Sequence, residues 1–173
     1  HRRLGVLMTE MVCRIGKERK EVRSRIEQLI ALHRVTAEIS QGTELQHILE
    51  TVTKTVVDTM KQKASSIRLL SASGKELMIY SAHSFSPQYM DLRPIPLAES
   101  DLDREVLNSD RPVYVEDMTS DPRVRDPDSA RKEGVVSALC APMLFEGKPE
   151  GVLRVFSEKK HVFDWFEWQL LRS

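Results

Sequence analysis

The chain has 173 residues, enough for one domain with its own core. It contains 26 Lys and Arg against 26 Asp and Glu, and this zero net charge argues against nucleic-acid binding, which requires excess positive charge. The two cysteines, Cys13 and Cys140, lack a metal-ligand spacing, so we expect no metal site and a reduced, cytoplasmic protein. No stretch reaches the roughly 20 apolar residues that a membrane span needs.

Residues 1–40 are predicted to form a long amphipathic helix, similar to a coiled coil, because they contain no Pro and repeat apolar residues along a narrow seam. Charged residues surround this seam, and such a helix usually pairs with another helix. We therefore expect a homodimer with parallel helices, although the helix could instead pack on its own domain. The predicted seam residues are Met11, Ile15, Val22, Ile26 and Leu29.

Residues 41–173 are predicted to form one globular domain. It begins with a helix, since Thr43 opens a capping-box pattern and apolar residues then recur at helical spacing to about Lys61. Two strands are expected next, at Ala64–Ser71 and Glu76–His83, because β-branched and apolar residues flank a short Ser-Gly turn.

The middle of the domain is predicted to alternate short helices with a strand. Ser100 and Asp103 have the spacing of a capping box and begin a short helix. A strand follows at Pro112–Asp117. Asp121, followed by Pro, predicts the N-cap of a short polar helical segment over Arg123–Glu133.

The last part of the chain carries a hairpin signature and a closing helix. Two apolar runs, Val136–Phe145 and Gly151–Ser157, are joined by a short connection that contains Gly. Asp164 and Glu167 repeat the capping pattern before the final helix, which we expect to be truncated because the chain reads as a fragment. Strands that pair with their neighbours predict an α+β fold, an antiparallel sheet with helices on one face.

The order of these motifs resembles a GAF domain. The run Ala-Ser-Ser-Ile-Arg-Leu-Leu at 64–70 is similar to the family's first strand, and the runs at Val113–Asp117, Ser137–Leu144 and Gly151–Leu153 match its order. The resemblance covers about residues 29–171. It implies a six-stranded antiparallel sheet preceded by a signalling helix, with a pocket between one sheet face and its overlying loops. It also implies a non-catalytic sensory or regulatory domain of a signal-transduction protein.

The resemblance implies a small-molecule pocket whose lining comes from the end of the second strand and from the segments that follow it. The lining residues expected from it are His83, Phe85, Tyr89, Tyr114, Asp117, Arg123 and Cys140. Nearby Arg125, Arg131 and Lys132 could meet an anionic ligand, or they could form a solvated surface balanced by neighbouring acids.

The specialised versions of the family are not indicated. Phe163 and Glu167 keep their separation from the family's cyclic-nucleotide motif, but its Asn and Asp are missing. Cys140 lacks the following His of bilin attachment, and no pair of cysteines is spaced for methionine sulfoxide reduction. We expect no catalytic residue and no cofactor. The alternatives are a structural dimerisation module without ligand and, in third place, an enzyme of the methionine sulfoxide reductase type.

Overall fold

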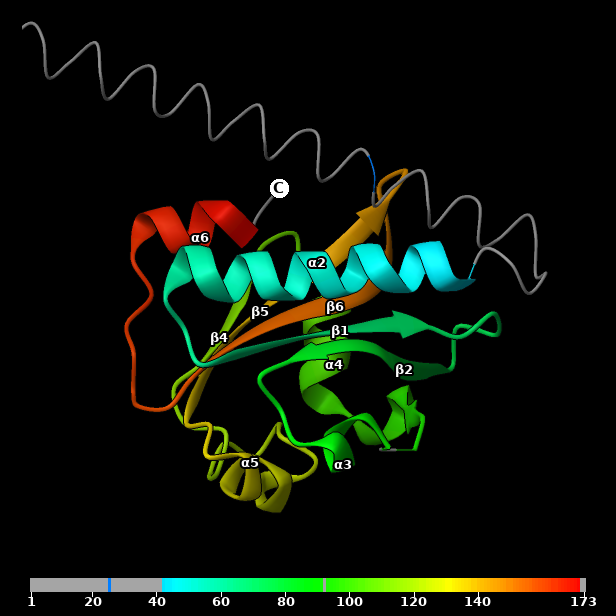
Figure 1. Cartoon of the computed structure of the whole chain (residues 1–173). Coiled ribbons are helices and arrows are strands. Elements are labelled where there is room, and N and C mark those ends of the chain that lie inside the picture. The colour runs from blue at the N-terminus through cyan, green and yellow to red at the C-terminus, as the bar shows by residue number, and fades with distance from the viewer. Residues whose placement is uncertain (1–24, 26–41, 92, 172–173) are drawn as a thin grey trace, which may run out of the picture.

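A computed structural model describes residues 25, 42–91 and 93–171, and in this part the chain forms one sheet flanked by helices (Figure 1). The helices are α2 (Gly42–Met60), α3 (Pro87–Met90), α4 (Asp101–Leu107), α5 (Pro127–Glu133) and α6 (Trp165–Leu171), with a 3₁₀ turn η1 (Leu97–Glu99). The strands are β1 (Ala64–Leu70), β2 (Glu76–His83), β3 (Ile95–Pro96), β4 (Val113–Val115), β5 (Ser137–Phe145) and β6 (Lys148–Ser157). The predicted dimer seam lies outside the described residues.

The sheet has the order β3-β2-β1-β6-β5-β4, and every neighbouring pair is antiparallel. Both predicted hairpins are present, since β1 pairs with β2 and β5 pairs with β6. At the centre of the sheet, β1 pairs with β6, and this pairing joins the two hairpins. The predicted α+β fold with a six-stranded antiparallel sheet is therefore confirmed.

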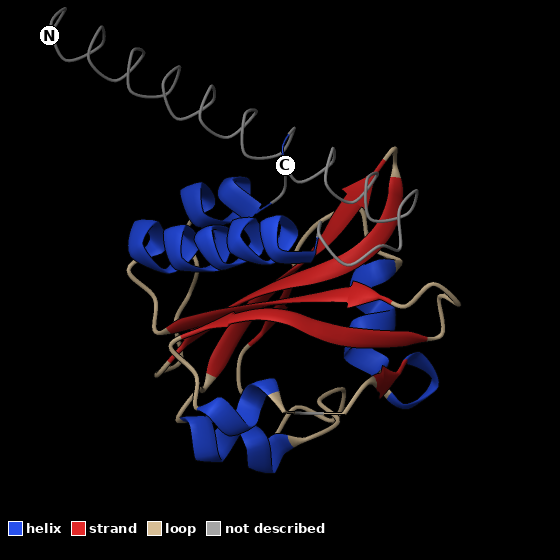
Figure 2. Cartoon of the chain, turned by 45° about the vertical axis from the view of Figure 1, so that its right-hand side comes forward, coloured by secondary structure: helices blue, strands red, loops and turns tan. Residues whose placement is uncertain are grey.

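Helices cover both faces of this sheet (Figure 2). The long helix α2 lies on one face, with α6 beside it, and the short helices α3, α4 and α5 lie on the other face (Figure 1). The sequence prediction placed helices on one face only. The short helices were missed as a second layer because each is only four to seven residues long and carries too little apolar periodicity to reveal a buried side.

Strand alternation sends different side chains to the two faces of the sheet. In β1, Ile67 and Leu69 pack in the same cluster as Leu49 of α2. Arg68, which lies between them, therefore points to the face opposite α2. In β6, Arg154 lies across from Ser66 of β1, so its side chain emerges on that same opposite face.

Two helix starts test the capping predictions. The α6 prediction is confirmed, since Asp164 Oδ1 accepts from Glu167 N at 2.8 Å and Glu167 Oε2 accepts from Asp164 N at 2.7 Å. The α5 prediction is wrong in position, because the N-cap is Asp126, whose Oδ1 accepts from Ser129 N at 3.0 Å. Asp121 instead closes a tight turn by accepting from Arg123 N at 2.9 Å. Both positions have Asp followed by Pro, so the local sequence alone could not choose between them.

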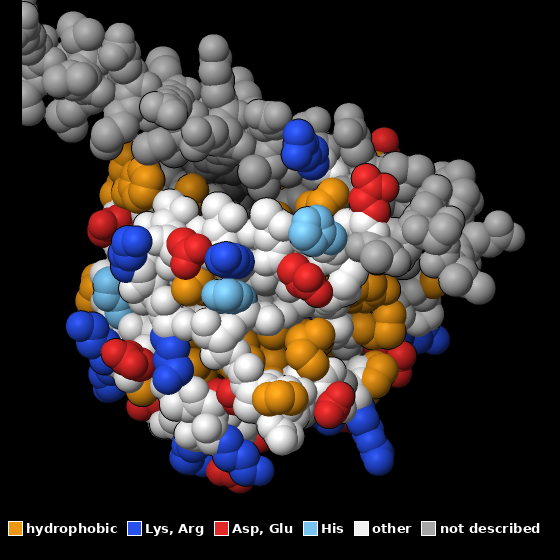
Figure 3. Space-filling model, viewed as in Figure 1, with side chains coloured by type: hydrophobic (Ala, Val, Ile, Leu, Met, Phe, Trp, Pro, Cys, Tyr) orange, Lys and Arg blue, Asp and Glu red, His pale blue; other side chains and the backbone are white. Residues whose placement is uncertain are grey.

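The face of the molecule that carries α2 is chemically mixed (Figure 3). On the face shown in Figure 3, acidic and basic side chains are interspersed over α2 and the strands beside it. None of the described helices is both long enough and apolar enough to cross a membrane.

Candidate functional site

A cavity of about 250 Å³ lies on the sheet face opposite α2, under the segments that carry α3, α4 and α5. Its floor comes from the central strands β1 and β6, and its other walls come from the chain between Phe85 and Val135. The lining combines apolar residues with charged and polar ones. The main apolar lining residues are Phe85, Ile95, Leu102, Met118, Val135 and Phe156.

A buried charged cluster occupies the floor of this cavity. Asp103 of α4 is fully buried, and it accepts hydrogen bonds from Arg154 Nη2, from Arg68 Nη1 at 3.5 Å and from Ser100 Oγ at 2.7 Å. Arg68 and Arg154 are 7% and 5% exposed, and both line the cavity. The carboxylate thus lies between two guanidinium groups on the two central strands and fixes α4 against the sheet.

The electrostatics of Asp103 follow from this arrangement. Burial alone would raise the pKa of the carboxyl group, but the charges of Arg154 and Arg68 and the Ser100 hydroxyl hold its pKa below the ordinary value. Burial by itself would lower the pKa of Arg154, and the Asp103 carboxylate raises it instead. Asp103 and Arg154 are therefore both charged at neutral pH.

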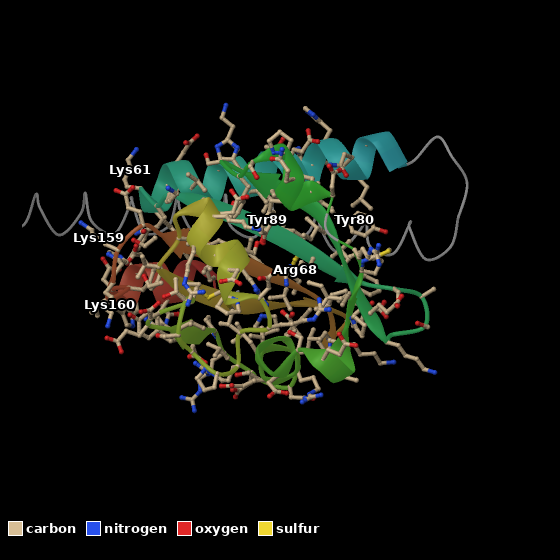
Figure 4. The ribbon with its side chains drawn as sticks, turned by 90° about the horizontal axis from the view of Figure 1, so that it is seen from below. Lys61, Arg68, Tyr80, Tyr89, Lys159 and Lys160 are labelled. Carbon is tan, nitrogen blue, oxygen red and sulfur yellow. The ribbon has the colours of Figure 1, made fainter. Side chains whose placement is uncertain are left out.

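An aromatic group closes the cavity on the α3 side. Phe85 stacks on Tyr89 with ring centroids 3.9 Å apart and meets Phe156 edge-on at 5.2 Å. The Tyr89 hydroxyl accepts from Arg68 Nη2 at 3.2 Å and lies 3.3 Å from Ser66 Oγ. Figure 4 shows Arg68 and Tyr89 near the centre of this face, whereas Lys61, Lys159 and Lys160 lie at its edge.

Charged side chains at the outer part of the cavity are engaged with the segments around them. Glu133 accepts from both the backbone N and the Oγ of Ser86, which ties α5 to the start of α3. Arg125 donates to Glu99 at 2.9 Å, which ties the segment before α5 to η1. These contacts join segments distant in the sequence into one cavity wall.

The structure brings only two of the seven predicted pocket residues, Phe85 and Tyr89, into the cavity lining. His83 pairs in register with Ser65, whose hydroxyl donates to a carbonyl of α2, so His83 belongs to the other sheet face. Tyr114 packs edge-on against Phe163, which belongs to the cluster under α6.

The other three predicted pocket residues have structural contacts outside the cavity lining. Asp117 accepts from Thr119 N at 2.9 Å in a turn. Arg123 binds the carboxylates of Asp121 and Glu105. Cys140 is fully buried in β5, and burial raises the pKa of its thiol to about 11, so it is a neutral thiol near pH 7.

The residues that sequence reasoning missed are those of the charged cluster, Arg68, Ser100, Asp103 and Arg154. A signal for two of them was present, since Arg68 is the lone charged residue in Ala64–Leu70 and Arg154 is the lone charged residue in Gly151–Ser157. A charged side chain in the middle of a buried strand requires a partner. Ser100 and Asp103 were interpreted as a capping box, but the Ser100 hydroxyl caps no backbone N–H and donates to Asp103.

A family model described as "GAF domain" matches residues 42–173. A comparison with curated proteins finds no match for this chain. Both results concern sequence, and the first agrees with the order of strands and helices described above.

Solved structures similar to this chain share its fold at low sequence identity. One is the GAF domain of a phosphoenolpyruvate-protein phosphotransferase from Coxiella burnetii, with a TM-score of 0.65, 16% identity, and 88% and 84% of the two chains covered. A domain assigned to a two-component sensor histidine kinase from Sinorhizobium meliloti gives 0.58, 16%, and 74% and 83%. A free methionine-R-sulfoxide reductase from Neisseria meningitidis, solved with its substrate, gives 0.59, 18%, and 89% and 81%.

Proposed function

Because the chain belongs to the GAF domain family, as its match over residues 42–173 shows, we propose that it is a non-catalytic sensory domain of a signal-transduction protein that binds a small molecule. The observation that carries this proposal is the cavity of about 250 Å³ under α3, α4 and α5, which combines apolar walls with a few convergent polar groups. The similar domain from a protein described as a two-component sensor histidine kinase supports the regulatory role.

The cavity is placed so that an occupant would affect the whole domain. Its floor is made by the two central strands, and its cover joins the α3 and α5 segments through the contact between Ser86 and Glu133. A bound molecule would contact both layers and favour their closed arrangement. The free energy of binding would then become a conformational signal, which is the requirement for a sensor.

Filling the cavity should remove this function without unfolding the domain. Ala130 of α5 lines the cavity and is 6% exposed, so Ala130→Leu places extra volume there, whereas Ala98→Leu adds the same volume on the exposed surface. We expect a ligand at a hundred times its Kd to raise the Tm of wild type and Ala98→Leu by about 5–10 °C, since such saturation adds about 2.7 kcal/mol to the free energy of unfolding. Ala130→Leu should lose this shift.

The measurement is a thermal-shift screen with small organic acids, their amides, nucleotides and cyclic nucleotides. A compound that stabilises wild type and Ala130→Leu equally would bind elsewhere and would count against the cavity. If a full screen produced no shift in wild type, the alternative of a structural module without ligand would be favoured.

We also propose that the domain works as a homodimer through the N-terminal helix. This proposal depends on the apolar seam in the sequence, at Met11, Ile15, Val22, Ile26 and Leu29. In light scattering, a chain that begins at Gly42 should have a lower oligomeric state, meaning fewer copies per particle, than the full 173 residues. Equal oligomeric states for the two chains would show that the seam is not the determinant of assembly.

Sulfoxide reduction at Cys140 finds no support in the site. Cysteine chemistry of that kind requires an accessible thiolate. Cys140 is fully buried, with its pKa raised to about 11 by burial, and it packs with Ala138 and Val152 in the core.

A further inference from the structure

We propose that the cavity binds a small organic carboxylate whose charged end meets Arg68 and Arg154. This inference rests on the proposed function, because it names the chemical class of ligand for the same cavity. Its first basis is the charge of the buried cluster. Two guanidinium groups share one carboxylate, Asp103, and no other described carboxylate forms an ion pair with either arginine. The cluster therefore carries one uncompensated positive charge in the interior of the domain.

A buried positive charge without a counter-charge is costly, because the protein interior solvates ions far less well than water does. Arg68 and Arg154 are 7% and 5% exposed, so bulk water solvates the excess positive charge poorly. Both side chains line the cavity. An anion inside the cavity would supply the missing charge, and an uncharged ligand would not.

The second basis is a set of unused hydrogen-bond donors. The Nε atoms of Arg68 and Arg154 have no hydrogen-bond partner among the described residues, but they are too buried to face the cavity, so the donors that a ligand would meet there are on the Nη atoms. Within the part of the chain that the structure describes, Arg154 donates only to Asp103, and Arg68 donates only to Asp103 and to the hydroxyl of Tyr89. A guanidinium group has several N–H donors in a planar fork that matches the two oxygens of a carboxylate.

The other charged groups of the cavity do not replace the missing anion. Glu133 already accepts two hydrogen bonds from Ser86, and Asp126 is exposed and caps α5 through Ser129 N.

The basic groups of the outer cavity do not compete for these acids. Arg125 is paired with Glu99, and Arg93 adds a further positive charge to the lining. The acidic groups thus lie at the α5 side, and the buried arginines lie on the sheet. This polarity directs a carboxylate toward the strands.

The remaining walls select an organic rather than an inorganic anion. Phe85, Met118 and Val135 belong to an apolar lining, and the volume of about 250 Å³ exceeds what a simple inorganic ion occupies. Burial of the apolar part of the ligand would contribute to affinity, and the carboxylate would provide specificity. A small aromatic or branched aliphatic acid satisfies both requirements.

The test compares benzoate with its neutral isostere benzamide and with nitrate, using calorimetric titration of the full chain. Arg68→Gln removes the excess charge and leaves the close contact between Arg154 and Asp103, whereas Arg111→Gln removes an exposed arginine outside the cavity. We expect benzoate to bind wild type and Arg111→Gln at least about tenfold more tightly than benzamide or nitrate does, and Arg68→Gln to lose this preference. Arg68→Lys, which keeps the charge, should recover part of it.

The outcomes separate this inference from the proposed function. If benzamide binds as well as benzoate and Ala130→Leu abolishes both, the cavity is a ligand site and the anion inference is wrong. If nitrate equals benzoate, the organic part of the inference is wrong. If none of the three probes binds, or if Ala130→Leu leaves their binding unchanged, both the inference and the cavity function fail for this class of ligand.

Discussion

Replacing Asp103 by Asn should reduce the free energy of unfolding by about 3–5 kcal/mol, the usual cost of removing one partner from a buried ion pair. The substitution keeps the size of the side chain but leaves Arg68 and Arg154 buried without their shared carboxylate. Urea unfolding followed by circular dichroism measures this loss. The control is Asp101→Asn, two residues before Asp103, which breaks an exposed contact with Arg104 and should cost about 1 kcal/mol or less.

Two further results check that charge is the cause. The double variant Asp103→Asn/Arg68→Gln should be more stable than Asp103→Asn alone, because it buries one positive charge fewer. The difference between wild type and Asp103→Asn should also depend on pH. Because the folded state lowers the pKa of Asp103, its contribution is complete above the unfolded-state pKa of about 3.9 and is lost as the pH falls through the lower folded-state pKa. A difference that stays constant from pH 7 to below pH 3 would contradict the account.

Gly151→Ala should also be strongly destabilising, by about 3 kcal/mol, at the upper end of the usual cost of overpacking a core. Gly151 lies in β6 opposite Leu69 of β1, and a Cβ there would lie 2.4 Å from the carbonyl oxygen of Arg68. The carbonyl oxygen belongs to the backbone and cannot move aside as the end of a flexible side chain can, so β1 and β6 must separate locally. The backbone of Gly151 is otherwise compatible with Ala, so the cost is a direct clash.

Gly74→Ala is the matched control for this prediction. Gly74 has φ +68°, and a Cβ there meets nothing within 4 Å, so the substitution adds backbone strain without a clash. Its expected cost is about 1 kcal/mol. Chemical denaturation of the two variants should therefore rank Gly151→Ala as clearly less stable. Equal losses would show that the contact between β6 and β1 is not the limiting one.

Much of the fold could be predicted from the sequence because its signals are local. The Ser-Gly turn and the strands around it defined the β1–β2 hairpin, and the connection through Gly147 defined the β5–β6 hairpin. Capping chemistry located α6, since the Asp164 and Glu167 side chains satisfy each other's backbone N–H groups. The second layer of short helices was missed because its packing depends on contacts between distant segments.

The site was harder to predict for the same reason. Arg68 and Asp103 are 35 positions apart, and Arg154 and Asp103 are 51 apart, so only the folded sheet brings them together. The spacing of Ser100 and Asp103 fits a helix cap equally well, which hid the second use of Asp103. His83 was expected in the pocket from its place at a strand end, but strand alternation decides the face, and one position shifts a side chain to the opposite side.

The most direct test of the central claim is a crystal structure of the full chain grown with 4-bromobenzoate, in which anomalous scattering locates the bromine. We predict one bromine site inside the cavity under α5, with the carboxylate within hydrogen-bond distance of Arg68 or Arg154 and the ring against Phe85 or Val135. A bromine site outside the cavity, or a ligand with its carboxylate turned away from both arginines, would contradict the account.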